Sequence, residues 1–203
     1  MILSLLTPDI SSPSVRQAFQ NCQDMHRCIM KAFDHGREEA KVLYRVLRTE
    51  KSIQIYVQSA EEPQWDRISQ YGFRCDKLKD ISQLPESFHT GQNLRFMLLA
   101  CPTKKVDSEG KNSRRVIIRG EEAQLDWLKR QGEKNGFMLL EAHLSGKSEQ
   151  VSGKRATGEF HLSGIPFEGV LQIQNPEAFR YGFENGIGSE KAYGFGMLMV
   201  AKV

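Results

Sequence analysis

The order of the expected secondary structure is the feature that most limits the fold, because the same order occurs twice along the chain. Strand-like runs with alternating apolar residues, helical stretches and short turns can be recognised from their periodicity. The elements expected in the first half are a strand at 2–7, a helix from about 14 to 33, strands at 41–48 and 52–58, a helix at 63–70 and a weak strand within 73–81. This is a β-α-β-β-α-β order.

The second half repeats that order after a linker-like segment at 82–91. Its expected elements are a strand at 93–100, a helix at 121–132, strands at 137–142 and 167–173, a helix at 176–183 and a strand at 197–201. Two such units predict an α+β protein with two tandem ferredoxin-like (RRM-like) domains, at residues 1–88 and 89–203. RNA-binding modules, metabolite sensors and enzymes share this fold, so function must be argued from sites.

A glycine-rich segment precedes the last expected strand. Residues 186–196 read Gly-Ile-Gly-Ser-Glu-Lys-Ala-Tyr-Gly-Phe-Gly and include Gly186, Gly188 and Lys191. Glycine lets backbone amides face an anion without an intervening side chain, and the lysine adds positive charge. A dinucleotide fingerprint needs a helix after its glycines, and a Walker loop needs Gly-x-x-x-x-Gly-Lys-Ser/Thr. Neither fits, so the segment indicates binding to a polyanion backbone.

Basic residues concentrate in two further segments, although the net charge of the chain is only +3. Between 103 and 119, six basic residues face two acidic ones; the six are Lys104, Lys105, Lys111, Arg114, Arg115 and Arg119. The second segment, 146–155, ends with Lys154 and Arg155. One such run is usually a solvated loop, but two loops of this kind favour a phosphate-facing surface. Neither contains interleaved aromatics, which suits the backbone of a folded RNA better than single-strand stacking.

No metal site can be assembled from the sequence. The five histidines lie far apart without His-x-x-x-His or cysteine pairing, and there is no Asp-x-Asp or Gly-x-Ser-x-Gly motif. An enzyme with this sequence is expected to use acid–base chemistry without metal or cofactor. The four cysteines lack a Cys-x-x-Cys pair, and no leader or membrane-length apolar run is recognised, so we expect reduced thiols in a cytoplasmic protein without membrane contact.

His26 is the candidate for that acid–base chemistry. Asn21 can cap a helix, with Asp24 three residues later, which puts His26 in the second turn. It then lies near the apolar stripe of Cys22, Ile29 and Phe33, with Gln23, Arg27 and Lys31 on the adjoining face. Two roles stay open. Spacing alone favours a histidine at the core edge with a backbone partner, whereas nearby basic residues suit a proton-transfer group beside phosphate.

Three segments together resemble the CasE family, the repeat-cleaving endoribonucleases of type I-E CRISPR systems. They are Met-His-Arg at 25–27 with Lys-Ala-Phe at 31–33, residues 94–104 with Asp-Trp-Leu at 126–128, and Phe-Glu-Gly-Val-Leu at 167–171 followed by 186–198. Their order spans essentially the whole chain. The resemblance implies tandem ferredoxin-like domains that bind the hairpin of a CRISPR repeat and cut precursor RNA at the base of its stem.

The resemblance also implies roles for individual residues. His26 matches the catalytic histidine, which assists attack of the RNA 2′-hydroxyl on the adjacent phosphate to leave a 2′,3′-cyclic phosphate. Arg27 and Lys31 match basic positions near the cleaved phosphate, and Lys154 and Arg155 match a basic hairpin against the RNA stem. The mature guide RNA would then stay bound as the protein joins the other subunits of the Cascade complex.

Departures from the family pattern concern three positions. Gln23 stands where members often carry tyrosine, and it can form hydrogen bonds but has no phenol. Leu99 and Cys101 replace a common arginine and asparagine, which is expected to alter RNA contacts rather than chemistry. The alternative to a nuclease is a non-catalytic RNA-binding subunit. A metabolite-binding pair of ferredoxin-like domains, the third possibility, predicts no salt-dependent RNA affinity.

Overall fold

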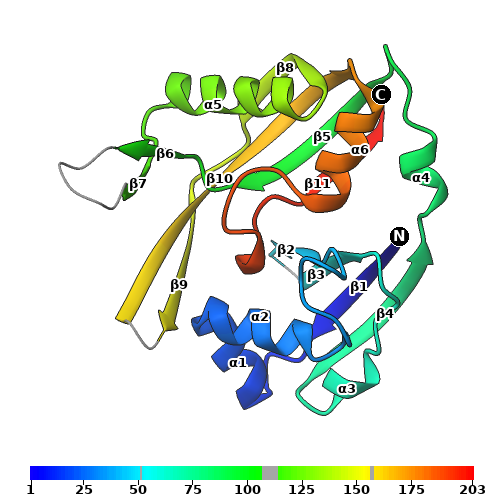
Figure 1. Ribbon diagram of the computed structural model, residues 1–203. Coiled ribbons are helices and arrows are strands. Elements are labelled where there is room, and N and C mark those ends of the chain that lie inside the picture. Colours follow the sequence, from blue (N-terminus) through cyan, green and yellow to red (C-terminus); the bar gives the residue numbers. More distant parts are fainter. Residues whose placement is uncertain (51, 107–113, 156–157) are drawn as a thin grey trace.

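The computed structural model describes residues 1–50, 52–106, 114–155 and 158–203, and these contain a four-stranded antiparallel sheet from the first half of the chain and a five-stranded antiparallel sheet from the second (Figure 1). The fifth strand of the second sheet, β9 (Glu149–Arg155), pairs with β10 outside the linear order of the other four. The first sheet has the order β2-β3-β1-β4 and the second has the order β11-β5-β10-β8. In both, the first strand of the unit lies between its third and fourth strands, which is the ferredoxin-like arrangement. The expected α+β class with two such units is confirmed; a boundary at residues 88 and 89 stays a prediction.

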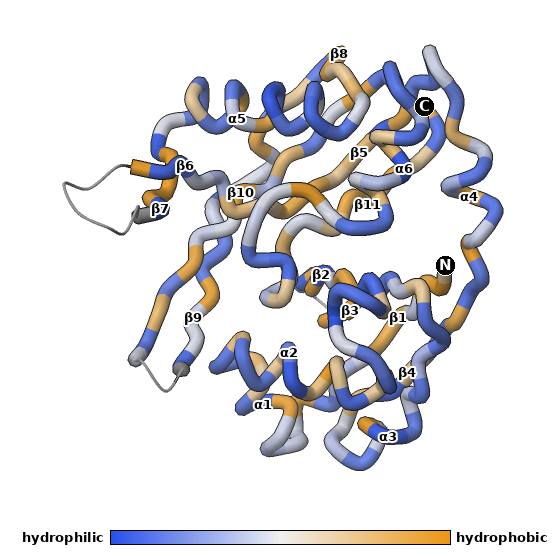
Figure 2. The backbone as a smooth tube through the Cα atoms, in the orientation of Figure 1, coloured by the Kyte–Doolittle hydropathy of each residue, from blue (hydrophilic) through white to orange (hydrophobic). Residues whose placement is uncertain are grey.

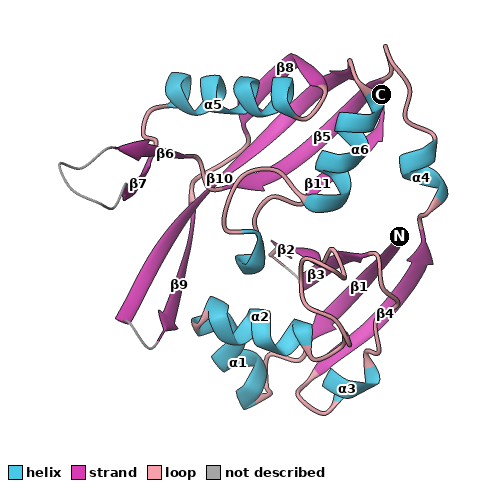
Figure 3. Cartoon of the chain, viewed as in Figure 1, coloured by secondary structure: helices cyan, strands magenta, loops and turns pink. Residues whose placement is uncertain are grey.

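The strands of these sheets are β1 (Ile2–Pro8), β2 (Leu43–Arg48), β3 (Ile53–Ser59), β4 (Phe73–Asp80), β5 (Asn93–Ala100), β8 (Phe137–Leu144), β10 (Gly158–Ile173) and β11 (Leu198–Lys202). The helices are α1 (Pro13–Gln20), α2 (Cys22–Met30), α3 (Asp66–Ser69), α4 (Gln83–Glu86), α5 (Glu121–Lys134) and α6 (Pro176–Asn185). A 3-10 turn, η1 (Lys191–Tyr193), lies in the glycine-rich segment. Figure 3 shows how these helices and strands are distributed over the two halves.

The helix expected at 14–33 is two helices, and that prediction was wrong in its extent. Asn21 separates α1 from α2 with an extended backbone (φ −135°, ψ 106°), and α2 ends at Met30. The side-chain oxygen of Asn21 accepts a hydrogen bond from the Gln23 amide at 3.1 Å, so a new helix begins at Cys22. The Asn21 Nδ2 group donates to Asp24 at 2.9 Å. The predicted cap at Asn21 is therefore confirmed.

Both basic segments were expected as loops from their composition, but their described parts contain strands, and the hairpin that the family resemblance implied around 154–155 is present. The first contains β6 (Thr103–Val106) paired with β7 (Arg114–Ile117), and the second contains β9 (Glu149–Arg155) paired with the start of β10. A hairpin that projects into solvent does not need an apolar face, so it lacks the alternation by which strands are recognised. Lys111 lies outside the described residues, as do the side chains of Arg114 and Arg155.

Each half buries its own hydrophobic core beneath its sheet. The first core includes Leu6, Ile29, Ile55, Ile68 and Phe73, and the second includes Leu128, Phe167, Leu171, Ile173 and Phe179. In Figure 2 the hydrophobic positions follow the strands of both halves and alternate with hydrophilic ones. This alternation is why the repeated order of elements could be recognised.

The glycine-rich segment connects the two halves. Between α6 and β11 it extends from the second half toward α2 of the first (Figure 1). Within it, Phe195 is buried with Leu99 and Cys101 in a third small core, against which Tyr193 packs. The Gly196 amide donates to the Leu99 carbonyl at 2.7 Å. The segment is thus held to the second sheet while η1 reaches the first half.

Candidate active site

His26 lies on α2 at the edge of the face that packs into the first core. Cys22, Met25 and Ile29 of this helix are buried, and the His26 side chain is half-buried beside them. Its ring meets the ring of Tyr193 edge-on, with centroids 6.3 Å apart and planes at 74°. Among the described residues, no group hydrogen-bonds to the imidazole nitrogens of His26. The backbone partner expected for a purely structural histidine is therefore not found in the described part of the chain.

The surroundings of His26 favour its neutral form. Burial lowers the pKa of its imidazole below the ordinary value of 6.5, and the positive charges of Arg37 and Arg27 lower it further. Near neutral pH the ring is therefore unprotonated. A neutral imidazole can accept a proton from a hydroxyl group, which is the first requirement of a general base.

The family pattern often has a tyrosine at the position of Gln23, and in this structure the phenol of Tyr193, from a distant part of the chain, lies next to Gln23. The Tyr193 hydroxyl donates a hydrogen bond to the Gln23 Oε1 atom at 2.8 Å. Gln23 precedes His26 by one turn of α2, so Tyr193 contacts the helix at two neighbouring positions. The Phe160 ring lies against Tyr193 with centroids 5.4 Å apart. Sequence reasoning assigned the glycine-rich segment to RNA binding alone and missed this contact.

A polar cavity of about 310 Å³, which we call the basic pocket, opens beside the glycine-rich segment. Its lining includes Arg115, Lys134, Lys191, Gly186, Gly188 and Tyr181. Four of these, Arg115, Gly186, Gly188 and Lys191, are predicted RNA-binding residues, and the structure brings them together. Lys134 and Tyr181 were missed because nothing in their local sequence distinguishes them from ordinary helix residues. The Tyr181 side chain is 68% exposed.

The basic pocket concentrates positive charge. Within the described part of the chain, no carboxylate lies at ion-pair distance from Arg115, Lys134 or Lys191. Burial, followed by the charges of Arg37 and Lys134, lowers the pKa of the Lys191 ammonium. The acidic group acting on Lys191 is Glu38, whose carboxylate lies 3.3 Å from Arg37. Such a cluster of cations attracts an anion, and a phosphate fits its chemistry.

The basic pocket and His26 are neighbours. Lys191, which lines the pocket, and Tyr193, which contacts His26, belong to the same 3-10 turn, η1. Arg37 depresses the pKa of both His26 and Lys191, so it lies near both. The turn η1 therefore connects the basic pocket to the imidazole of His26.

The structure separates some of the other predicted residues from His26. The Lys31 ammonium lies 4.0 Å from the centre of the Tyr71 ring, and its position is about 140° around the helix axis from His26. Arg27 stays beside His26, but its guanidinium is 3.3 Å from the Asp24 carboxylate and 65% of its side chain is exposed. Lys31 is thus not brought to the imidazole, whereas Arg27 is.

The remaining basic residues lie around the site. Lys104 and Lys105 are exposed on β6, beside Thr103 of the basic pocket. Lys154 is exposed on β9, and its backbone amide donates to the Asn21 side-chain oxygen at 3.2 Å. The β9–β10 hairpin therefore contacts the beginning of the helix that carries His26.

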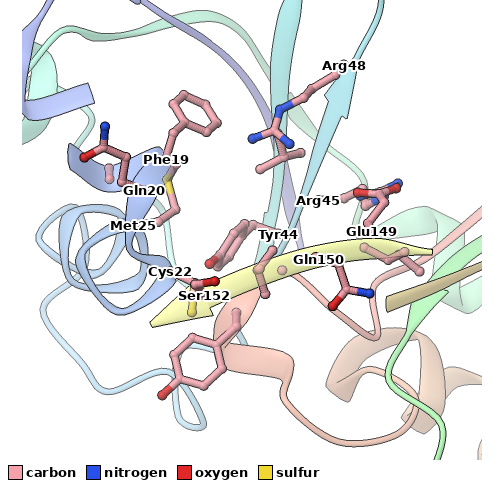
Figure 4. Close-up of a pocket in the computed structure, with 16 residues that line it drawn as sticks. Phe19, Gln20, Cys22, Met25, Tyr44, Arg45, Arg48, Glu149, Gln150 and Ser152 are labelled. Atoms are coloured by element: carbon pink, nitrogen blue, oxygen red, sulfur yellow. The ribbon is translucent and has the colours of Figure 1, made fainter. Parts of the chain in front are cut away.

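A second cavity, of about 180 Å³, lies between the two halves (Figure 4). Its walls include Tyr44 and Arg45 of β2, Glu149 and Gln150 of β9, and Cys22 of α2, with Tyr193 at its border. Arg45 Nη1 donates to Glu149 Oε2 at 2.9 Å. This pair neutralises one of the two arginines that line the cavity; the other, Arg48, lies over the Phe19 ring.

Metal sites and membrane spans are two further features that bear on function. Among the described residues, no three His, Cys, Asp or Glu side chains form a group that could hold a metal ion. In the part of the chain that the structure describes, no helix combines the length and apolar character needed to cross a membrane.

Comparison with known proteins finds relatives over the whole length of the chain. A model of the family described as CRISPR associated protein matches residues 1–202. The CRISPR-associated endoribonuclease Cse3 of Thermus thermophilus is 30% identical over 99% of this chain and 100% of its own. The structure of Thermus thermophilus Cse3 bound to an RNA representing a pre-cleavage complex is 28% identical, covers 98% of both chains and has a TM-score of 0.86.

A more distant structure, the CRISPR-associated protein Cas6e from Escherichia coli str. K-12, shares the fold at 24% identity and a TM-score of 0.76, covering both chains completely. The match of the family model over nearly every residue and the full-length relative lead to one conclusion. The chain belongs to the family of CRISPR associated proteins, and its resemblance to the CasE endoribonucleases is confirmed.

Proposed function

We propose that this protein is an endoribonuclease that binds the hairpin of a CRISPR repeat and cleaves precursor CRISPR RNA at the base of the stem. The observation that carries the proposal is a half-buried His26 with a lowered pKa, in contact with Tyr193 of the turn whose Lys191 lines a pocket of cations. The relative named as an endoribonuclease, and its structure with an RNA representing a pre-cleavage complex, support it.

The proposed reaction requires no metal ion. His26 takes the proton of the RNA 2′-hydroxyl as its oxygen forms a bond to the adjacent phosphorus. The bond from phosphorus to the 5′-oxygen breaks, and that oxygen keeps the electron pair and takes a proton from water. The products are a 2′,3′-cyclic phosphate and a 5′-hydroxyl, and the imidazolium returns its proton to the hydroxide formed from that water.

The RNA contacts proposed for this reaction fall into four groups. The basic pocket, with Arg115, Lys191, Gly186 and Gly188, would hold the backbone near the cleaved phosphate. The remaining residues are Lys104, Lys105 and Arg114 of the first hairpin, Lys154 and Arg155 of the second, and Arg27 and Lys31 near α2. For Lys31 this role requires its ammonium to leave the Tyr71 ring.

Retention of the product is the last part of the proposal. The mature guide RNA would stay bound, and the protein would join the other subunits of the Cascade complex in the cytoplasm. The alternative of a non-catalytic RNA-binding subunit would share these contacts but show no cleavage.

Incubation with the cognate repeat hairpin in excess EDTA tests the proposal. We expect cleavage that ends in a cyclic phosphate, and His26→Ala should slow it by about 10²–10⁴-fold while RNA affinity is retained. His89→Ala, at an exposed histidine of the linker, is the control and should cleave normally. Cleavage that needs magnesium, or that is unchanged by His26→Ala, would contradict the proposal. Binding without cleavage by the unmodified protein would favour the alternative subunit role.

A further inference from the structure

We infer that Tyr193 of the glycine-rich segment is a positioning residue for His26, so that the active centre is completed by both halves of the chain. The inference rests on the proposed function. It assigns the segment a part in catalysis, whereas the sequence suggested RNA binding only.

Two contacts tie Tyr193 to α2. Its ring meets the imidazole of His26 edge-on at 6.3 Å, and its hydroxyl donates to Gln23 Oε1 at 2.8 Å. These helix positions are one turn apart on the same side. A ring fixed at both points cannot slide along or away from the helix, so it restricts the orientations open to the imidazole. Edge-to-face geometry is also the favourable arrangement for two aromatic rings.

Tyr193 is itself held firmly. Its amide donates to the Glu190 carbonyl at 3.0 Å, which closes η1, and the Phe160 ring supports its other contacts. The next residue, Gly194, has φ 86°, and a Cβ there would lie 3.0 Å from the Tyr44 ring. Glycine is therefore needed for the turn to sit this close to β2. A supporting residue must be rigid if it is to orient a catalytic group.

Tyr193 also contributes to the chemistry of the imidazole through burial. Burial is the main cause of the lowered pKa of His26, and the Tyr193 ring covers part of it. Removing the ring would admit water, let the pKa rise toward 6.5 and free the imidazole to rotate. Because the Tyr193 hydroxyl donates to Gln23, we assign it no proton transfer with the RNA.

Single-turnover cleavage measured across pH, with affinity for a 2′-deoxy hairpin measured in parallel, tests this role. We expect Tyr193→Leu to cleave about 10–100-fold more slowly, with affinity within about threefold of the unmodified protein. The acid limb of its rate profile, which is the fall in rate at low pH as His26 becomes protonated, should move toward pH 6.5. Tyr56→Phe, a tyrosine of β3 outside the site, is the control and should change neither quantity.

A double-mutant cycle separates the hydroxyl from the ring. Tyr193→Phe keeps the ring, so it should preserve the acid limb, and its loss of rate should not add to that of Gln23→Ala because both remove one hydrogen bond. If Tyr193→Leu does not fold, this cycle still tests whether Tyr193 acts on His26 through Gln23. Three outcomes would each overturn the inference. Tyr193→Leu could keep the rate and acid limb of the unmodified protein, or it could lose only affinity for RNA. The losses of rate in Tyr193→Phe and Gln23→Ala could also be fully additive. Absence of cleavage by the unmodified protein would instead overturn the proposed function.

Discussion

At the scale of single residues, the charges around His26 have two effects. Arg37 and Arg27 disfavour a proton on the free imidazole and lower its pKa. The same cations attract a phosphate, and the negative charge of a bound phosphate offsets them and raises the pKa again. In the proposed reaction, the imidazole of His26 is therefore neutral before RNA binds and becomes a stronger base once RNA is bound.

The pH dependence of cleavage follows from the direction of this shift. Because the folded pKa of His26 lies below 6.5, kcat/KM should be constant near neutral pH and fall only when the pH drops below that lowered value. Arg37→Ala removes one cation that lowers the pKa of His26, so the acid limb should move toward pH 6.5. Arg74→Ala, at an exposed arginine of β4, should leave it in place. An acid limb above pH 6.5 in the unmodified protein would contradict this assignment.

Spacing along one helix predicted that His26 lies at a core edge, and the structure agrees. It could not predict Tyr193 or Arg37 as neighbours, because periodicity relates residues within an element and carries no information about contacts between halves. Conversely, nearness in sequence does not ensure nearness in the structure. Lys31 is five residues from His26, but the turn of the helix directs its side chain to Tyr71.

At the scale of elements, α2 depends on the side chain of Asn21. One oxygen of that side chain accepts hydrogen bonds from the amides of Gln23 in α2 and Lys154 in β9. The sequence predicted the cap, since asparagine is a common capping residue. The composition of 146–155 did not predict β9, because the strand signal of this segment is weak.

Two helix caps in the chain provide a matched comparison for this dependence. Asn21 caps α2, and Asn175 caps α6 by accepting a hydrogen bond from the Ala178 amide at 3.1 Å. Replacement of either by alanine should lower the free energy of unfolding by about 1 kcal/mol, measured by urea denaturation. Only Asn21→Ala should also slow cleavage, since α2 carries His26. Equal cleavage rates in the two variants would show that the start of α2 does not affect the site.

At the scale of the whole molecule, the repeated order of elements predicted both sheets but not their mutual position. Some of the contacts between the halves are polar. Lys41 pairs with Glu184 at 2.6 Å, and the Gln58 amide donates to the Phe183 carbonyl at 2.9 Å. Such contacts leave no hydrophobic pattern in the sequence. The relation between His26 and the basic pocket therefore had to come from the structure.

Salt dependence tests whether the basic pocket takes part in RNA binding by the whole molecule. Lys134 at the end of α5 lines the pocket, whereas Lys129 of the same helix is exposed outside it. Lys134→Ala should weaken binding of the hairpin and reduce the slope of log affinity against log salt by about one, as expected for one lost phosphate contact. Lys129→Ala should leave the slope unchanged. Equal slopes in both variants would exclude a phosphate contact at Lys134.

The contact between η1 and α2 has a consequence for the synthesis of the protein. The ribosome makes α2 long before it makes Lys191 and Tyr193, so a chain interrupted anywhere between α2 and α6 carries the imidazole without the turn that covers it. On the proposed composite centre, such a nascent chain holds an unsupported, solvated histidine and should cleave RNA more slowly than the complete chain. Full nuclease activity is then expected only after translation has passed η1.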